Sequence, residues 1–575
     1  MTTVEQTYAP SKRAPLWLLW TGSWLLFLCF AHGNLETRDA AITMNASRAL
    51  WLRGDAGLLK PEDGGEWLAE QLIASHIAAN SGIEYGKTGK DGVHQYVWFP
   101  YGHVWLMVPF VAMGETLQGW WPEVEERYRE HKLAVVGDGS PMLYAEGQFA
   151  FDQGLVAMGL PALFGATSVL MLFLLARVLG CSERRALLCA GVIALATQCF
   201  PLTRETLSDG PGLAFLLAAL LAVVRVHLGD TSTKTLLLGG VAAGCAVLTR
   251  YQHAFPLLAM LVVVGMAARR ERRWSMLLWF AAGGAPFAVL LFSTNLARFG
   301  SLMDTGYPSA DSWFTYPVYL GITKLLIAAG KGILWFSPIL LLMLPVALKR
   351  RNVPHLRWLA WILFAIPMLM FGATSGWQSG QCWGARYVTA GVVVFLALTL
   401  PQAQPWARWP RMFWLLVVAG LVVSLTSLLA PTRGYNQLAG AAVRVMYEQQ
   451  FERGEIGEED LAALDEPQHY FFLPQFSPLH ANWTYAWQVC SGRFEDDQGL
   501  PRLAPEDTLE PLFGITSEDR GRSVAPVHWE DRGFRHLWFV MWGALLSVPW
   551  WLLFLLPALP AFALLRAFWR RLSRD

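Results

Sequence analysis

The sequence has few charged residues. Asp, Glu, Lys and Arg make up 15% of its 575 positions, whereas hydrophobic residues make up 54%. A soluble protein carries roughly 25% charged residues, so this composition argues against a chain of several soluble domains. The formal net charge is only +1, which excludes a global electrostatic attraction to nucleic acid. The composition therefore favours an integral membrane protein.

Cysteine is also scarce. The seven cysteines form no CxxC pair and no Cys/His spacing of the kind that holds zinc, which argues against a zinc or disulfide scaffold. The first apolar run lacks a small-residue cleavage site, so we expect a retained membrane anchor rather than a cleaved signal peptide. No internal repeat is visible, and this counts against a transporter built from inverted halves.

Long apolar runs are what the sequence has in abundance. A membrane-spanning helix needs roughly 20 mainly apolar residues. Such runs lie near residues 15–32, 150–177, 185–202, 209–228, 234–250, 252–268, 274–296, 332–348, 356–373, 385–401, 411–430 and 537–565. We therefore predict an all-α polytopic membrane protein with about twelve transmembrane helices.

Basic residues gather in alternate loops between these runs. The clusters are Lys12/Arg13, Arg184/Arg185, Lys234, Arg269/Arg270/Arg272/Arg273, Lys349/Arg350/Arg351, Arg408/Arg411 and Arg570/Arg571/Arg574. Loops rich in Lys and Arg remain on the cytoplasmic side of a membrane. We therefore expect both termini in the cytoplasm, in a multi-pass protein of the cell inner membrane.

Two shorter apolar stretches, 104–113 and 318–329, do not have the length to span a bilayer, and we predict that both lie in the interface. Counting the first as a span would put the later basic clusters outside. The predicted organisation is a transmembrane domain at 1–430 that includes a first outer loop at 33–149. A small mixed extracytoplasmic domain follows at 431–536, and the last transmembrane helix and cytoplasmic tail occupy 537–575.

Two carboxylates, Glu36 and Asp39, stand where the chain leaves the bilayer after the first apolar run. A partly desolvated carboxylate there is suited to act as a general base toward an acceptor hydroxyl. The alternative is a solvated interfacial pair with Arg38 as its salt-bridge partner. Tyr101 and His103 follow at the start of the first interfacial stretch, where His103 either contacts a phosphate or an acceptor or is structural.

Several cations lie at predicted outer ends of spans, where the positive-inside rule disfavours them. They are Arg204, Arg250, Arg298, Lys331 and Arg386. Guanidinium groups at such positions can clamp a phosphate in two hydrogen bonds, as a lipid-phosphate substrate at the interface requires. The alternative is that these side chains reach lipid headgroups or pair with neighbouring acids, as Arg204 could with Glu205.

Two outer segments have the composition of binding loops. Residues 374–387 contain Trp377, Gln381 and Tyr387 among glycines, and residues 295–307 end at Tyr307. Glycines permit close backbone approach, while aromatic and amide side chains suit stacking on a sugar and hydrogen bonding to it. Ordinary Gly-rich turns with interfacial tryptophans are the alternative.

The order of these segments resembles the GT-C superfamily of membrane glycosyltransferases, in its bacterial branch similar to protein O-mannosyltransferases and lipid A aminoarabinose transferases. The motifs that carry the resemblance are Glu36-Thr37-Arg38-Asp39, then "DGVHQYVWFPYGH", "NLARFGSLMDTGY", "GKGILWFSPILLL" and "WQSGQCWGARY". The resemblance implies inverting transfer of a sugar from a polyprenyl-phosphate donor to an acceptor hydroxyl or amine at the outer face. The acceptor would be a glycan, a lipid or a protein.

The resemblance also implies roles for single residues. Asp39, or Glu36, would be the catalytic carboxylate, and Arg386 would hold the donor phosphate with support from Arg250, Arg204 and Lys331. The substrate-binding candidates are His103, Tyr101, Trp377, Gln381, Tyr387 and Tyr307. Phe99-Pro100-Tyr101 replaces the double proline common in both subfamilies, and 431–536 lacks the Trp-Trp-Asp motif of oligosaccharyltransferases. We expect no cofactor, and outside Glu36/Asp39 and Glu205/Asp209 no outer acidic pair favours a metal.

Two other functional classes fit part of the pattern. A transporter or flippase for a lipid-linked or anionic solute would also use outer arginines and buried aromatics. It should, however, leave ionisable residues near the middles of the spans, where few occur. A non-catalytic assembly subunit would tolerate replacement of Asp39 and Arg386.

Overall fold

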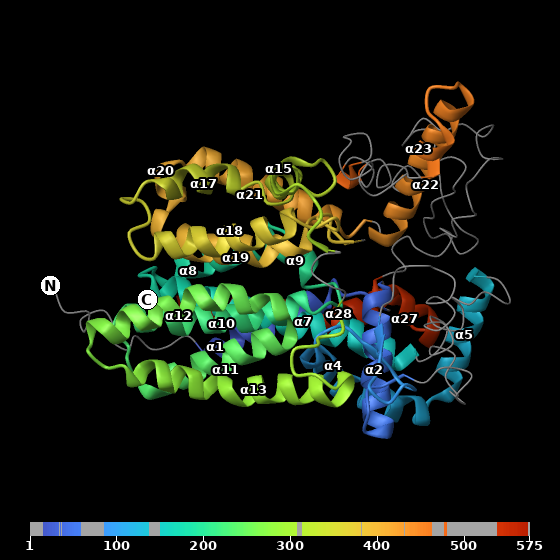
Figure 1. Cartoon of the computed structure of the whole chain (residues 1–575), viewed down its shortest axis with the longest axis horizontal. Coiled ribbons are helices and arrows are strands. Elements are labelled where there is room, and N and C mark those ends of the chain that lie inside the picture. The colour runs from blue at the N-terminus through green and yellow to red at the C-terminus, as the bar shows by residue number, and fades with distance from the viewer. Residues whose placement is uncertain are drawn as a thin grey trace.

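A computed structural model describes residues 15–33, 35, 37–58, 86–136, 150–307, 313–380, 382–429, 432–462, 477–479, 483 and 537–572. These residues form a bundle of long helices with shorter helices across one end (Figure 1). The bundle helices are α1 (Leu16–Leu28), α7 (Ala150–Val178), α8 (Glu183–Leu195), α10 (Asp209–His227), α11 (Thr233–Thr249), α12 (Ala254–Arg270), α13 (Ser275–Phe299), α18 (Arg357–Gly372), α19 (Arg386–Ala403) and α21 (Pro410–Thr426). Each coincides with a predicted apolar span.

Six helices in the described part are long and apolar enough to cross a membrane: those in α7, α10, η3–α12 (Tyr251–Arg270), α13, α19 and α28 (Trp550–Leu572). Five further apolar helices are shorter, among them α1 and α11. Large apolar side chains on α13 and α28, such as Leu278 and Leu556, are exposed, as on a surface that faces lipid. The protein is thus an all-α polytopic membrane protein, and the count of twelve spans stays a prediction.

Three predicted spans are interrupted rather than continuous. Residues 185–202 divide into α8 and α9 (Cys199–Leu202), and 332–348 divide into α16 (Ile333–Phe336) and α17 (Leu340–Leu348). Residues 537–565 divide into α27 (Trp538–Leu546) and the start of α28. Pro338 stands at the second break and Pro549 at the third. Proline has no backbone N–H to donate within a helix, so it interrupts the helix at these points. At the first break, the Thr197 hydroxyl accepts from the Cys199 N–H at 3.1 Å.

In the described part of the first outer loop there are three helices and a hairpin. Helices α2 (Arg38–Arg53), α4 (Tyr101–Trp120) and α5 (Pro122–Val136) lie at the end of the bundle, where α2 runs across its long axis (Figure 1). Helix α4 extends well beyond the predicted stretch of 104–113. Strands β1 (Gly86–Thr88) and β2 (Gln95–Val97) pair antiparallel with Lys87 opposite Tyr96. The second predicted interfacial helix is present as α15 (Val318–Ile327).

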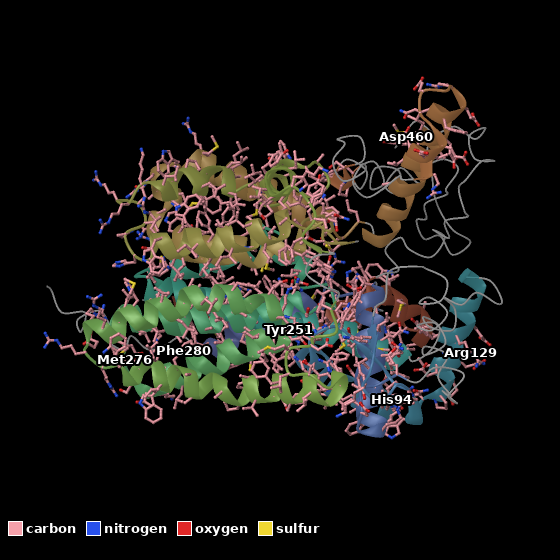
Figure 2. The ribbon with its side chains drawn as sticks, in the orientation of Figure 1. His94, Arg129, Tyr251, Met276, Phe280 and Asp460 are labelled. Carbon is pink, nitrogen blue, oxygen red and sulfur yellow. The ribbon has the colours of Figure 1, made fainter. Side chains whose placement is uncertain are left out.

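The region after α21 is described only in part. Helix α22 (Thr432–Glu452) and helix α23 (Glu458–Ala462) extend from the bundle at the same end as α5 (Figure 1). Asp460 and Arg129 both stand away from the bundle in Figure 2. Most of the predicted extracytoplasmic domain at 431–536 lies outside the described residues, so its extent stays a prediction.

Loops that carry basic clusters contact one another at one end of the bundle. Arg184 donates to the Leu572 carbonyl oxygen at 3.2 Å, and Arg270 donates to the His227 carbonyl oxygen at 2.9 Å. Arg408 bonds Asn352 in the same region. Met276 lies near this end, whereas His94 of the first outer loop lies near the other (Figure 2). The basic loops and the first outer loop therefore occupy opposite ends of the molecule.

A buried ion-pair cluster fastens α2 to the bundle. The Arg48 guanidinium of α2 contacts Glu115 of α4, and its Nε lies 3.2 Å from Oδ2 of Asp152 on α7. Asp152 is only 1% exposed. Gly114 makes room for it, because a Cβ there would lie 2.0 Å from the Asp152 Oδ1. The Ser47 hydroxyl adds a 2.8 Å bond to the Val104 carbonyl oxygen.

Replacing Arg48 with Met should destabilise the protein by about 1–3 kcal/mol, because Glu115 and Asp152 would lose the charged hydrogen-bond partner that they share. The measurement is the thermal unfolding midpoint of the purified protein in detergent.

Arg129→Ala is the matched control. Arg129 pairs with Glu126 on α5, and both side chains are about half exposed, so little change is expected. Unfolding of Arg48→Met at the same temperature as the natural protein would contradict a structural role for the cluster.

Candidate active site

Asp39 is placed by the start of α2. The Thr37 hydroxyl caps the helix by accepting from the Ala40 N–H at 3.2 Å. The Thr43 hydroxyl donates to the Asp39 carbonyl oxygen at 2.6 Å, which fixes the backbone of the first turn. The Asp39 carboxylate remains 25% exposed, at a helix end whose dipole favours negative charge. Glu36, the other candidate base, lies outside the described residues.

Arg386, the first residue of α19, meets this carboxylate. Its Nη2 lies 3.0 Å from Oδ2 of Asp39, although the two residues are 347 positions apart in the chain. The loop before Arg386 turns at Gly380 and Gly384, whose positive φ values of 71° and 67° suit glycine. At Gly384 a Cβ would also lie 2.6 Å from the Gln198 amide nitrogen.

Lys331 donates hydrogen bonds to the backbone of the same loop. Its Nζ donates to the carbonyl oxygens of Gly380 at 2.8 Å and Cys382 at 2.6 Å, and it is fully buried. Burial lowers the pKa of Lys331. Glu205 accepts from the Trp383 N–H at 3.1 Å and fixes the loop from the other side. These contacts make Lys331 a support for the backbone that leads into Arg386.

A second carboxylate and guanidinium, Asp209 and Arg250, also lie beside Tyr387. The Arg250 Nη1 is 2.5 Å from Oδ2 of Asp209 and 3.2 Å from the Ser208 hydroxyl. Both guanidinium groups stand over the Tyr387 ring, Arg386 at 5.1 Å and Arg250 at 5.3 Å from its centroid. The sequence indicated Asp209 only as a possible metal carboxylate. It did not predict the pair with Arg250.

Tyr387 is itself fixed by stacking. Its ring lies 4.5 Å from the Phe371 ring at an interplanar angle of 29°. Two cations on one ring form a cation–π cluster, and each guanidinium also has its own carboxylate. The arrangement provides two positive groups, close together and partly buried, whose present partners are both side-chain anions.

An aromatic cluster borders these charges. Tyr307 stacks on Trp98 at 5.8 Å and 11°, and it meets Tyr251 and Trp313 edge to face at 6.1 and 5.9 Å. Tyr101 lies under Arg298, whose guanidinium carbon is 5.0 Å from the ring centroid. Trp98, Tyr251 and Trp313 were not among the sequence candidates, because nothing in their spacing sets them apart from interfacial tryptophans and tyrosines.

Three other candidates have contacts of a different kind. Arg204 is 2% exposed and donates to the carbonyl oxygens of Phe30 at 2.7 Å and Ser427 at 2.9 Å, which ties α9 to the ends of α1 and α21. Trp377 is fully buried beneath Lys324. Gln381 lies outside the described residues. The roles of Arg204 and Trp377 in substrate binding stay predictions.

A groove opens beside Tyr387 between α10, α12, α18 and α19. It has an empty volume of about 390 Å³. The lining residues are Leu216, Gln252, His253, Pro256, Leu363, Ile366, Pro367, Met370, Phe371, Tyr387, Ala390, Gly391 and Val394. Most are apolar, so the groove suits a hydrocarbon chain whose polar end lies near Arg250 and Arg386. Among the described residues no three His, Cys, Asp or Glu side chains are grouped to hold a metal ion.

Part of the chain that carries these charged residues is similar to a known protein family. Residues 149–297 match the profile of the family described as dolichyl-phosphate-mannose-protein mannosyltransferase. The resemblance to GT-C glycosyltransferases is confirmed. The matched segment runs from the start of α7 to the end of α13 and contains Arg204, Asp209 and Arg250.

Two crystal structures of ArnT from Cupriavidus metallidurans are similar to this chain over most of its length. The structure bound to undecaprenyl phosphate has 12% sequence identity and a TM-score of 0.43, and the match covers 92% of this chain and 76% of that one. The apo structure has 12% identity and a TM-score of 0.41, with 94% and 75% covered. No curated protein matches the chain.

His103, the remaining candidate, gives a pH prediction. It is 2% exposed at the start of α4, and burial lowers its pKa to about 3, with Arg250 acting in the same direction and the Thr206 backbone opposing both. The unfolded chain takes up this proton near pH 6.5, so stability is full above that pH and falls as pH decreases below it. The expected loss is about 1.4 kcal/mol for each pH unit.

Unfolding midpoints of the natural protein and His103→Gln between pH 7.5 and pH 5 check this expectation. The difference between the two proteins should shrink as pH falls, because Gln does not titrate. Parallel pH profiles would contradict it.

Proposed function

We propose that this membrane glycosyltransferase moves a sugar from a polyprenyl-phosphate donor to an acceptor hydroxyl or amine, with inversion at the anomeric carbon. The observation that carries the proposal is the 3.0 Å pairing of Asp39 with Arg386 beside Arg250 and Tyr387. It brings a carboxylate suited to proton transfer next to cations suited to a phosphate. The matching family, described as dolichyl-phosphate-mannose-protein mannosyltransferase, supports the same donor class.

Arg386 and Arg250 are the proposed phosphate ligands. Both are about 10% exposed, so water screens their charge poorly and a phosphate between them would be held strongly. The bond that breaks joins the sugar to a phosphate oxygen, and its electron pair stays on that oxygen. Cations that face this leaving group therefore stabilise the transition state more than the ground state.

The groove beside Tyr387 is the proposed place of the lipid chain. It is partly open, so it would take the part of the chain that lies next to the phosphate. The rest of a polyprenyl chain would then lie in the bilayer. Apolar walls from α18 and α19 and polar groups at one end match an amphipathic donor.

Asp39 is the proposed base. It pairs with Arg386, so a donor phosphate would compete with it for the same guanidinium. Once displaced, the carboxylate accepts the proton of the acceptor hydroxyl or amine while the acceptor atom bonds to the anomeric carbon. Donor binding thus both fills the cation site and frees the base.

The aromatic cluster is the proposed wall for the sugar. Trp98 and Tyr307 are partly exposed beside the charged groups, and aromatic faces pack well on the apolar face of a sugar ring. Acceptors that remain consistent with the site are a glycan, a lipid or a protein.

The site is proposed to face the periplasm or exterior of an inner membrane. The basic loops lie at the opposite end of the bundle, and such loops remain in the cytoplasm. A transporter is less well supported, because the paired charges lie at the ends of the helices rather than along their middles.

Asp39→Asn should abolish transfer, by at least about 100-fold, since the base is lost. It should bind undecaprenyl phosphate at least as tightly as the natural protein, because asparagine removes the anion that competes for Arg386. Transfer assays and lipid-phosphate titrations on the purified protein measure the two effects.

Glu126→Gln is the control, because Glu126 pairs with Arg129 on α5, outside the site. It should leave both quantities unchanged. Undiminished transfer by Asp39→Asn would overturn the assignment of the base.

Arg386→Ala should weaken lipid-phosphate binding by about 10- to 100-fold, the cost of a lost charged hydrogen bond. Arg129→Ala, far from the site on α5, serves as the control. An unchanged dissociation constant for Arg386→Ala would contradict the phosphate role.

A further inference from the structure

The groove beside Tyr387 has one buried polar side chain in its wall. His253 precedes α12, is 2% exposed, and lines the groove among Leu216, Pro256 and Phe371. Within the described part of the chain its Nδ1 has no hydrogen-bond partner. A buried polar atom without a partner is uncommon in a folded protein and calls for a specific explanation.

The His253 ring is held in place from two directions. Its backbone N–H donates to the Arg250 carbonyl oxygen at 3.0 Å, so the two residues share one turn. On α10, a Cβ at Gly212 would lie 3.3 Å from the His253 Nε2 and 3.4 Å from the Arg250 Cβ. Gly212 therefore lets α10 pack closely against both side chains, which keeps the imidazole beside the guanidinium.

His253 lies where the hydrocarbon chain of a bound lipid would join its phosphate headgroup. The groove is apolar along α18 and α19, and Arg250 and Arg386 meet over Tyr387 at its edge. A neutral imidazole with its proton on Nδ1 has one hydrogen bond to donate, and a phosphate oxygen is a strong acceptor. A free phosphate would be held by the two guanidinium groups alone, whereas a chain in the groove carries its phosphate past His253.

We propose that His253 is a further donor-binding residue, which donates a hydrogen bond from Nδ1 to the phosphate of a polyprenyl phosphate lying in the groove. The inference rests on the proposed function and adds to it a residue that recognises the junction of chain and phosphate. It accounts for both the buried unpartnered nitrogen and the absence of a side chain at Gly212.

The test is titration of undecaprenyl phosphate into the full-length protein in nanodiscs. His253→Phe keeps a ring of similar size and removes the hydrogen bond, and it should weaken binding about 10-fold. His253→Asn places an amide N–H near the position of Nδ1 and should restore affinity to within about 3-fold of the natural protein. His355→Phe, an exposed histidine at the opposite end of the bundle, should change nothing.

The outcomes separate the inference from the function it rests on. Tight binding by both the natural protein and His253→Phe would overturn the role of His253 and leave the proposed function intact. Equal losses in His253→Phe and His253→Asn would indicate packing alone and would also overturn it. No binding by the natural protein would overturn both, and unfolding midpoints confirm that each variant is folded.

Discussion

The Asp39–Arg386 ion pair is the interaction on which the candidate site depends. Its two side chains come from helices that begin at the same end of the bundle, one in the first outer loop and one in the bundle itself. Each charge is partly buried and has the other as its partner, which lowers the cost of placing it at the end of the bundle. In the proposed function a lipid phosphate replaces the carboxylate at Arg386.

Other buried charges keep this pair in position. Arg48 joins α2 to α4 and α7, which fixes the helix that carries Asp39. Lys331 binds two carbonyl oxygens of the loop before Arg386, and Arg204 binds carbonyl oxygens at the ends of α1 and α21. The outer cations therefore divide into two kinds. Some donate hydrogen bonds to backbone oxygens, and others pair with carboxylates. The second kind, Arg386 and Arg250, are the proposed phosphate ligands.

The sequence predicted the helices and singled out Asp39 and Arg386. It did not predict which of the outer cations bind backbone oxygens and which pair with carboxylates. Apolar length was sufficient for the long helices, because the thickness of a bilayer sets the length of a helix that crosses it. The number of spans and the side on which each loop lies stay predictions. Apolar length and loop charge could not show that single apolar runs are interrupted at Pro338 and Pro549. Nor could they separate Lys331 from Arg386, since that difference depends on which backbone oxygens fold against each cation. His253 was missed because a lone histidine in an apolar run gives no signal until its neighbours are known.

The central claim is that a lipid phosphate takes the place of Asp39 at Arg386. The most direct measurement is a cryo-EM structure of the full-length protein with undecaprenyl phosphate bound. The account predicts phosphate density between Arg386 and Arg250 above the Tyr387 ring, lipid density in the adjoining groove, and an Asp39 carboxylate no longer bonded to Arg386. Phosphate density elsewhere, with the Asp39–Arg386 pair unchanged, would contradict it.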